Sequence, residues 1–330
     1  MTGKIGWIEN LRAVACMMVV LIHSTTYYII SGGTPGDAHW NVANLLNSAS
    51  RVCVPLFFMI SGYLFFGERR AQKKHFLRIG LCILFYSAIA LIYIAALTPI
   101  NPLNAINYFL QKPIFYHLWF FYAIVVIYLF SPFINVQPVS GKYLAIFIVL
   151  LAVIANPNTG RVEFAGVKLL PVNLYIYGDT FYYLLYAVVG RALGMLDIPR
   201  KAVMVAIPLF IFCVALVAMG TKHHTLLNDN FNQTFYIYCG PLVFLAAVSL
   251  LAVFKRYLNH RVLPGFALIS RHSLAIYGIH ALIIHYLRTH GMNFPSQPVL
   301  DIFYVFTIAL LGSLLLSMAL QKIDTRRLVS

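Results

Sequence analysis

The amino-acid sequence predicts an all-α polytopic membrane protein. Three observations support this prediction: 61% of the 330 residues are hydrophobic, only 10% are charged, and the mean hydropathy is +0.82. A water-soluble domain usually carries about 25% charged residues, and a chain of this length cannot bury so much apolar surface in one core. Because lipid offers the backbone no hydrogen-bond partner, the long apolar runs are expected to be helices.

A membrane-spanning helix needs roughly 20 apolar residues, and about ten runs of the sequence are candidates. No repeat of 20–50 residues is visible and no soluble domain fits between the runs, so residues 1–330 are expected to form a single transmembrane domain. The fifth run is short, and it can cross only where the bilayer thins or its polar flanks are partly immersed. The ten candidate runs are residues 11–30, 52–66, 76–97, 113–134, 142–155, 174–193, 202–220, 234–254, 268–287 and 299–320.

The distribution of lysine and arginine predicts the orientation, because loops on the cytoplasmic side carry an excess of both. With the N-terminus in the cytoplasm, the C-terminus is also cytoplasmic, and most of the 24 basic residues lie in inner segments. We therefore expect a multi-pass membrane protein with both termini in the cytoplasm and with membrane lipids as partners. The net charge of +15 reflects this topology, and no basic soluble face is left to bind nucleic acid. The basic residues of the outer segments are Arg51, Lys112, Arg161, Lys168, Lys222 and Arg288.

The first run carries two ionisable residues, Arg12 and His23, and lacks a small-residue cleavage site, so we expect a span and not a signal peptide. Their spacing of 11 residues brings both to one helix face, about 16 Å apart along the axis. Arg12 lies near the cytoplasmic mouth, and His23 lies beyond the midplane. Arg12 alone is explained by snorkelling to headgroups, and His23 alone by a hydrogen bond between helices. A shared face favours one cavity lined by both, with His23 as a general base.

The second run contains the small pair Ser61-Gly62, for which composition favours close helix packing over a narrow approach to a ligand. The basic loop that follows either anchors the topology or holds an anionic ligand. The fourth run opens with His117 and Trp119, where an aromatic belt explains the tryptophan more readily than the histidine. Asp179 is the carboxylate expected inside a span, where it either orients a histidine or caps its helix.

The ninth run, residues 268–287, places Arg271 on the cytoplasmic side and His280 and His285 toward the outer side. Four intramembrane histidines raise the question of zinc, but the runs lack partner carboxylates or thiolates at metal spacing, so no metal site is expected. The five cysteines all lie in apolar runs without a C-x-x-C motif, and we interpret them as small core residues.

Motifs along nearly the whole chain resemble those of the membrane-bound acyltransferase-3 family. Segment 9–15, E-N-L-R-A-V-A, is similar to the family's D-G-L-R-A-I-A opening, and His23 is separated from Arg12 by ten residues as in the family. Glu9-Asn10 stands where the family usually has Asp-Gly, which leaves the role of Glu9 open. The other similar segments are 55–64 (F-F-x-I-S-G-Y-L), 73–78 (a basic start of the third span), 117–120 (H-L-W-F/Y) and 270–280 (S-x-S-L-x-I-Y-x-x-H).

This resemblance implies transfer of an acyl group, expected to be acetyl, from acetyl-coenzyme A to a sugar hydroxyl of a cell-envelope glycan. Acetyl-coenzyme A is then a co-substrate, and no permanently bound cofactor is expected. The implied catalytic residues are His23, Arg12 and Glu9. The implied substrate-binding residues are Ser61, Gly62, Tyr63, Lys73, Lys74, Arg78, His117, Trp119, Asp179, Arg271, Ser273, Tyr277 and His280.

Two other classes of function fit a polytopic protein with buried polar residues. One is a transporter or flippase of a glycan or lipid-linked sugar, although no inverted repeat or pair of half-helices stands out. The other is a non-catalytic membrane scaffold, which leaves the shared face of Arg12 and His23 unexplained.

Overall fold

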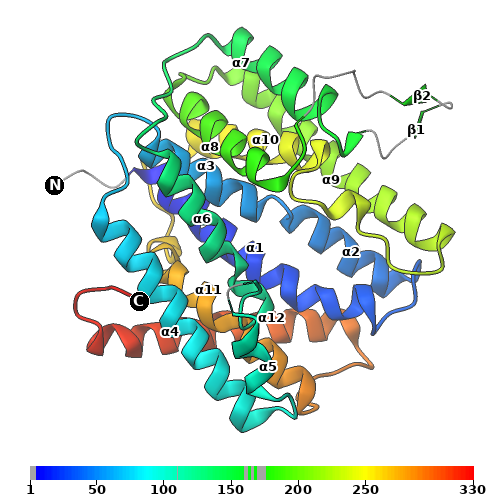
Figure 1. The fold of residues 1–330 in the computed structure, drawn as a ribbon. Helices are drawn as coiled ribbons and strands as arrows, with labels where there is room; N and C mark the ends of the chain where they lie inside the picture. Colours follow the sequence, from blue (N-terminus) through cyan, green and yellow to red (C-terminus); the bar gives the residue numbers. More distant parts are fainter. Residues whose placement is uncertain (1–4, 110, 160–162, 165–166, 169–175) are drawn as a thin grey trace.

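The computed structural model describes residues 5–109, 111–159, 163–164, 167–168 and 176–330. Helices dominate this part (Figure 1), and β1 (Glu163–Phe164) and β2 (Val167–Lys168) form a small antiparallel pair. The all-α fold class predicted from the sequence is confirmed. The helices are α1 (Gly6–Ile30), α2 (Ala38–Ser50), α3 (Cys53–Phe65), α4 (Lys73–Leu97), α5 (Pro102–Asn107), η1 (Tyr116–Leu118), α6 (Trp119–Phe130), α7 (Gly141–Ile148), η2 (Val149–Ile154), α8 (Asp179–Met195), α9 (Arg200–Leu227), η4 (Thr234–Tyr236), α10 (Pro241–Tyr257), α11 (Phe266–Thr289) and α12 (Pro298–Ile323).

Seven helical segments are long and apolar enough to cross a membrane, which confirms a polytopic membrane protein. Shorter apolar helices occupy Tyr116–Phe130 and Gly141–Ile154, where the fourth and fifth runs were predicted. The sixth predicted run corresponds to α8, and its first residues, 174–175, lie outside the described part of the chain. The seven long segments are Gly6–Ile30, Ala38–Phe65, Lys73–Leu97, Arg200–Leu227, Thr234–Tyr257, Phe266–Thr289 and Pro298–Ile323.

The predicted start of the second run, at residue 52, needs correction, because this segment begins fourteen residues earlier with α2 (Ala38–Ser50). The polar residues of α2 lower its hydropathy, so the sequence does not indicate a membrane span there. In the structure these residues are buried and form hydrogen bonds. Asn44 donates to the backbone oxygen of Ala218 at 2.8 Å, and Asn47 donates to the Thr25 hydroxyl at 2.9 Å. Hydrogen bonds of this kind allow polar side chains to lie inside a helical bundle.

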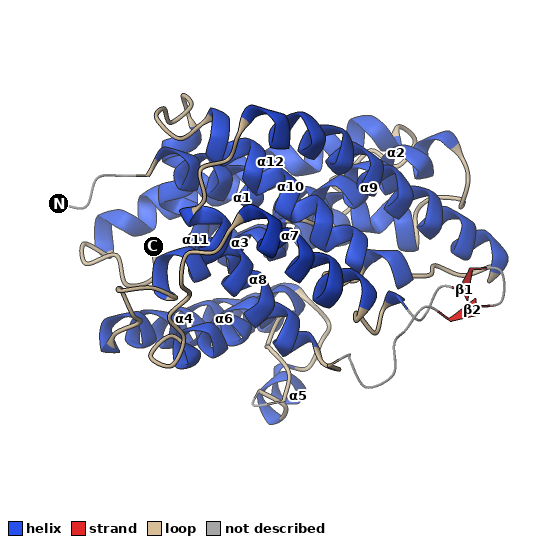
Figure 2. Cartoon of the chain, turned by 90° about the horizontal axis from the view of Figure 1, so that it is seen from above, coloured by secondary structure: helices blue, strands red, loops and turns tan. Residues whose placement is uncertain are grey.

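Helix α1 lies at the centre of the fold and packs against α2, α3, α10, α11 and α12 (Figure 1). Leu11, Ala15 and Val20 of α1 are fully or almost fully buried. The start of α1 and the C-terminus lie at the same end of the bundle in Figures 1 and 2, which we call the terminal end. This arrangement agrees with an even number of crossings. Arg12 therefore lies toward the terminal end of α1, and His23 toward the opposite end.

Helices α3 and α8 approach each other closely because both present glycine at their contact. A Cβ atom on Gly62 would lie 2.0 Å from the Ala187 carbonyl oxygen, and one on Gly190 would lie 2.3 Å from the Met59 carbonyl oxygen. No side chain fits in such a space. The structure therefore supports the packing interpretation of Gly62.

Replacing Gly62 with alanine is expected to destabilise the protein by about 1–3 kcal/mol, because the two helices must move apart. Thermal unfolding of the purified protein in detergent measures this effect. Gly80→Ala is the matched control, since Gly80 also lies within a helix and an added Cβ meets no atom within 4 Å. Equal melting temperatures for the two variants would contradict the packing role.

Residues 324–330 fold back onto α4 at the terminal end. The Asp324 carboxylate accepts hydrogen bonds from the backbone N–H groups of Leu328, Val329 and Ser330 at 2.8–2.9 Å. The Tyr86 hydroxyl donates to the Val329 carbonyl oxygen at 2.5 Å. Desolvation raises the pKa of Asp324, but the three N–H donors outweigh it, so the net pKa is below the ordinary value.

Folding lowers the pKa of this carboxylate, so its ionised form stabilises the folded state at every pH above its unfolded pKa of about 4. This stabilisation is lost as the pH falls through the pKa of the folded state. We expect the amides of residues 328–330 to be protected from hydrogen exchange at neutral pH and to lose protection below about pH 4. Asp324→Asn is expected to lack this pH dependence. Protection that is the same in wild type and variant at every pH would contradict the role of Asp324.

Candidate active site

Three histidines from separate segments meet in the half of the bundle opposite the terminal end. The ring of His23 in α1 lies 5.2 Å from that of His280 in α11, and the His280 ring lies 5.3 Å from that of His117 in η1. We call these three residues the histidine cluster. Two tyrosines border it: Tyr116 lies 5.2 Å from His23, and Tyr277 lies 5.6 Å from His117, measured between ring centroids.

Backbone carbonyls fix the orientation of two of these rings. His280 Nδ1 lies 3.0 Å from the Ile276 oxygen and 2.8 Å from the Tyr277 oxygen, and His117 Nε2 lies 3.1 Å from the Gly278 oxygen. A carbonyl only accepts hydrogen bonds, so each of these nitrogens is assigned the ring proton. In the part of the chain that the structure describes, the other nitrogens, His280 Nε2 and His117 Nδ1, are buried without a partner. Each ring therefore keeps one unused hydrogen-bond acceptor.

His23 is half-buried, and its ring makes no hydrogen bond to any residue that the structure describes. It is held in place by packing between Tyr116 and His280. A general base needs a lone pair that no protein group occupies, and His23 meets this requirement. The structure brings His23, His117 and His280 together in one half of the bundle, with Tyr277 beside them, and their roles remain predictions.

Trp119 lies beside this cluster but faces a different set of residues. Its ring is 6.0 Å from that of Tyr183 in α8 and 6.0 Å from that of Tyr238, with which it is stacked. Tyr183 stacks in turn on Phe58 at 4.4 Å. We call Trp119, Tyr183, Tyr238 and Phe58 the aromatic wall. Flat aromatic surfaces of this kind suit the face of a sugar ring.

Arg12 and Arg78 both lie toward the terminal end. Arg12 forms an ion pair with Glu9 at 3.3 Å, and the positive charge of Arg78 acts on its guanidinium. Arg78 donates from Nη2 to the Ser330 carbonyl oxygen at 3.1 Å, while its buried Nε has no partner. The two arginines place positive charge at this end of the bundle, which suits an anionic ligand.

The other predicted basic residues lie on the surface. Lys73 and Lys74 are exposed in the first turn of α4, one turn before Arg78. Arg271 is exposed on α11, and its charge acts on the neighbouring His272. The protein does not enclose these side chains, and no contact in the described residues joins them to Arg12.

Three further predicted binding residues make packing contacts. Ser61 donates to the Phe57 carbonyl oxygen at 2.8 Å, and Ser273 donates to the Ser270 carbonyl oxygen at 2.9 Å. The ring of Tyr63 meets that of Trp7 edge-on at 5.1 Å. The proposed binding roles of Ser61, Tyr63 and Ser273 therefore remain predictions.

The expectation that Asp179 is the carboxylate inside a span needs correction. Asp179 is exposed at the first residue of α8, and no hydrogen bond in the described part of the chain joins it to a histidine. The buried carboxylate is Asp301 of α12, which is fully enclosed. It pairs with Arg288 and accepts hydrogen bonds from the Tyr28 hydroxyl at 2.9 Å and the Phe294 amide at 2.7 Å. Sequence reasoning missed this pair, although both residues lie at the outer ends of predicted spans.

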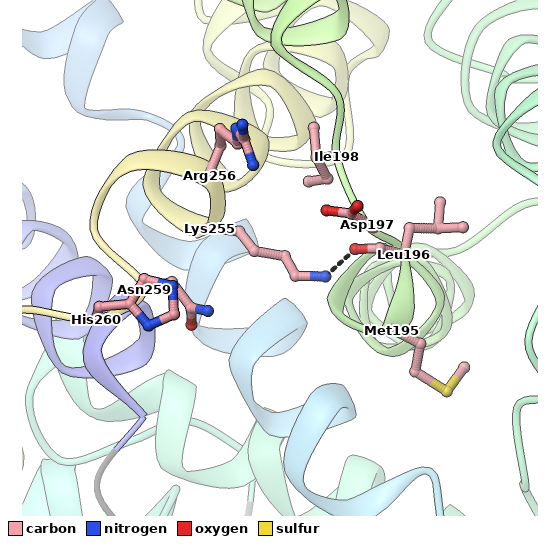
Figure 3. Close-up of a pocket in the computed structure, with 8 residues that line it drawn as sticks. All are labelled: Met195, Leu196, Asp197, Ile198, Lys255, Arg256, Asn259 and His260. Atoms are coloured by element: carbon pink, nitrogen blue, oxygen red, sulfur yellow. Dashed lines mark hydrogen bonds between the residues drawn. The ribbon is translucent and has the colours of Figure 1, made fainter.

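A cavity of about 310 Å³ lies away from the histidine cluster, between the C-terminal ends of α8 and α10 (Figure 3). Lys255 crosses it and donates to the carbonyl oxygens of Leu193 and Leu196, the latter bond being drawn in Figure 3. Lysine at this position satisfies carbonyl groups left free where α8 ends. We therefore assign Lys255 a structural role. Across the residues that the structure describes, no group of three or more His, Cys, Asp or Glu side chains is arranged to hold a metal ion.

Comparison with known proteins decides the family. The acyltransferase domain profile of the acyltransferase-3 family matches residues 5–321. The chain belongs to the acyltransferase-3 family. Among curated proteins, an amino-acid racemase from Enterococcus faecalis is 29% identical over 139 residues, which are 38% of this chain and 19% of the racemase. This chain thus spans about a fifth of the length of that relative. No solved structure matches the chain.

The family match and the candidate spans together describe a multi-pass membrane protein with an acyltransferase domain. An acyl transfer needs an acyl donor and an acceptor brought together at one reacting centre. The histidine cluster provides unused ring nitrogens within the bundle. Arg12, on the same face of α1 as His23, and Arg78 of α4 provide positive charge toward the terminal end. These two features are the candidate acceptor and donor sites.

Proposed function

We propose that this acyltransferase moves an acetyl group from acetyl-coenzyme A to a sugar hydroxyl of a cell-envelope polysaccharide in the bacterial inner membrane. The acceptor that we favour is enterobacterial common antigen, because the motifs of the chain resemble those of its O-acetyltransferase. The proposal rests on one observation. His23 has no hydrogen-bond partner among the described residues, lies on the face of α1 that also carries Arg12, and contacts His280.

In this proposal His23 is the general base. The hydroxyl oxygen of the sugar bonds to the thioester carbonyl carbon while its proton passes to His23. The tetrahedral adduct then breaks its carbon–sulfur bond, and the proton returns from His23 to the departing sulfur of coenzyme A. His280 Nε2 and His117 Nδ1 accept hydrogen bonds from hydroxyl groups of the acceptor and so orient it.

The donor binds at the terminal end of the bundle, which we place on the cytoplasmic side of the membrane. Arg12 and Arg78 bind phosphate groups of coenzyme A, and Lys73, Lys74 and Arg271 add positive charge around them. Glu9 holds Arg12 in position through their ion pair at 3.3 Å. The separation of Arg12 and His23, about 16 Å along α1, matches an extended pantetheine arm.

Substituting both Arg12 and Arg271 with alanine is expected to weaken binding of coenzyme A by tenfold or more, since charge-assisted contacts to phosphate are lost. Wild-type affinity should also fall as salt concentration rises. Calorimetry on the purified protein at two salt concentrations measures both effects. Lys142→Ala, which removes an exposed basic residue of the α7 start, is the control. Unchanged affinity in the double variant would contradict the donor site.

Turnover of radiolabelled acetyl-coenzyme A by the purified protein tests the function itself. We expect free coenzyme A to appear only when a glycan acceptor is present, together with label in the glycan. A transporter or flippase would move the glycan across a vesicle membrane without thioester cleavage. That result would contradict the proposed function.

A further inference from the structure

Arg51 is an unneutralised cation in the half of the bundle that holds the histidine cluster. It follows the last residue of α2 and is half-buried. Its guanidinium lies 4.2 Å from the ring centroid of Tyr236 and 5.4 Å from that of Tyr238. No carboxylate in the described residues forms an ion pair with it. The contrast is Arg288, whose charge is neutralised by Asp301.

Asn47 ties Arg51 to the turn of α1 that carries His23. The fully buried Asn47 accepts a hydrogen bond from Arg51 Nε at 2.8 Å through its side-chain oxygen. Its side-chain nitrogen donates to the Ile22 carbonyl oxygen at 3.2 Å and to the Thr25 hydroxyl at 2.9 Å. These contacts fix the arginine beside the proposed base, and the charge of Arg51 acts on His23.

Tyr238 links Arg51 to the aromatic wall. The Arg51 guanidinium lies 5.4 Å from the ring centroid of Tyr238, and that ring stacks with the ring of Trp119 at 6.0 Å between centroids. Trp119 follows His117 by two residues and begins α6. A cation, a sugar-stacking surface and the proposed base therefore line one region. A half-buried positive charge without a counter-ion is partly desolvated at a cost, and a bound anion offsets that cost.

We propose that Arg51 binds an anionic group of the glycan acceptor, a carboxylate of a uronic acid or a phosphate of the lipid carrier, and so places a neighbouring sugar hydroxyl at His23. The guanidinium matches both groups because its N–H donors form a planar fork. Trp119 and Tyr238 contact the sugar face. This proposal rests on the proposed acetyl transfer to a glycan and gives its acceptor a chemical class.

Three probes separate the possible sources of the anion. The first is an oligosaccharide of alternating glucuronic acid and N-acetylglucosamine, and the second is the same oligosaccharide with its carboxyl groups reduced to alcohols. The third is N-acetylglucosamine linked to polyprenyl diphosphate. Binding of each probe to the purified full-length protein is measured without a donor, and acetyl transfer to each is measured separately.

We expect wild type to bind at least one anionic probe tenfold or more tightly than the carboxyl-reduced oligosaccharide, and Arg51→Gln to lose this preference. Arg51→Lys should keep part of it, because the charge remains. Lys222→Gln, which removes another basic residue predicted on the outer side, should keep it fully. Coenzyme A binding and thermal stability of Arg51→Gln are measured alongside.

Preference for the glucuronic acid probe indicates a uronic acid, and preference for the diphosphate probe indicates the lipid carrier. The proposal is overturned if wild type binds all three probes equally, or if Arg51→Gln keeps the preference of wild type. A loss of stability without any change in the preference would make Arg51 a structural residue only, and would also overturn it. Anion-selective binding without acetyl transfer to any probe would support the role of Arg51 and contradict the proposed function.

Discussion

Replacing His23 with alanine is expected to lower acetyl transfer by about 10²-fold or more while the protein remains folded in the membrane. His23 has no hydrogen-bond partner among the residues described, so its loss leaves no buried group unpaired in the protein. The effect should therefore fall on the rate of transfer and not on stability. Transfer from radiolabelled acetyl-coenzyme A to glycan, normalised to folded protein, measures it.

His39→Ala is the control for this prediction, because His39 is exposed on α2 and makes no contact with the histidine cluster. It should transfer acetyl at the wild-type rate. Binding of coenzyme A should be the same in wild type and in His23→Ala, since His23 lies about 16 Å along the helix from Arg12. A His23→Ala protein that is well folded and transfers acetyl at a near-wild-type rate would rule out His23 as the base.

Replacing Asp301 with alanine is expected to give the largest loss of stability, about 3–5 kcal/mol, because Arg288 is left as a buried charge without its partner. The same change removes the acceptor of the Tyr28 hydroxyl and the Phe294 amide. These contacts join α1, α12 and the loop before α12, so their loss loosens three segments at once. Unfolding of the purified protein in detergent measures the difference in free energy.

A double-mutant cycle separates the ion pair from the rest of this network. Asp301→Leu combined with Arg288→Met should be less damaging than the sum of the two single changes, since neither charge remains. Strictly additive effects would show that the two side chains do not interact in the folded protein.

Positions within one helix were predictable from the sequence, because helix geometry fixes them. Eleven residues bring Arg12 and His23 to one face of α1 whatever surrounds that helix. The depth of each histidine in the membrane was also predictable. His117 lies near the start of a run that enters from the outer side, and His280 lies near the end of a run that leaves on that side. The ring distances among His23, His117 and His280 confirm that all three lie at a common depth.

The direction in which each helix faces its neighbours was not predictable, because it depends on tertiary packing. Trp119 lies at the expected depth but turns toward Tyr183 and Tyr238. Helix α2 was not predicted as part of a span because burial of its polar residues is favourable only when partners such as Thr25 form hydrogen bonds with them. Asp301 is a further example, since its pairing with Arg288 requires α11 and α12 to pack side by side.

Mass spectrometry of cell-envelope glycans tests the central claim most directly. Glycans are compared from cells that lack this chain and from the same cells carrying wild type or His23→Ala. We expect a glycan species heavier by one acetyl group only in cells with wild type, and fragmentation should place that acetyl on a sugar oxygen. An acetylation pattern that is identical in all three would contradict the account.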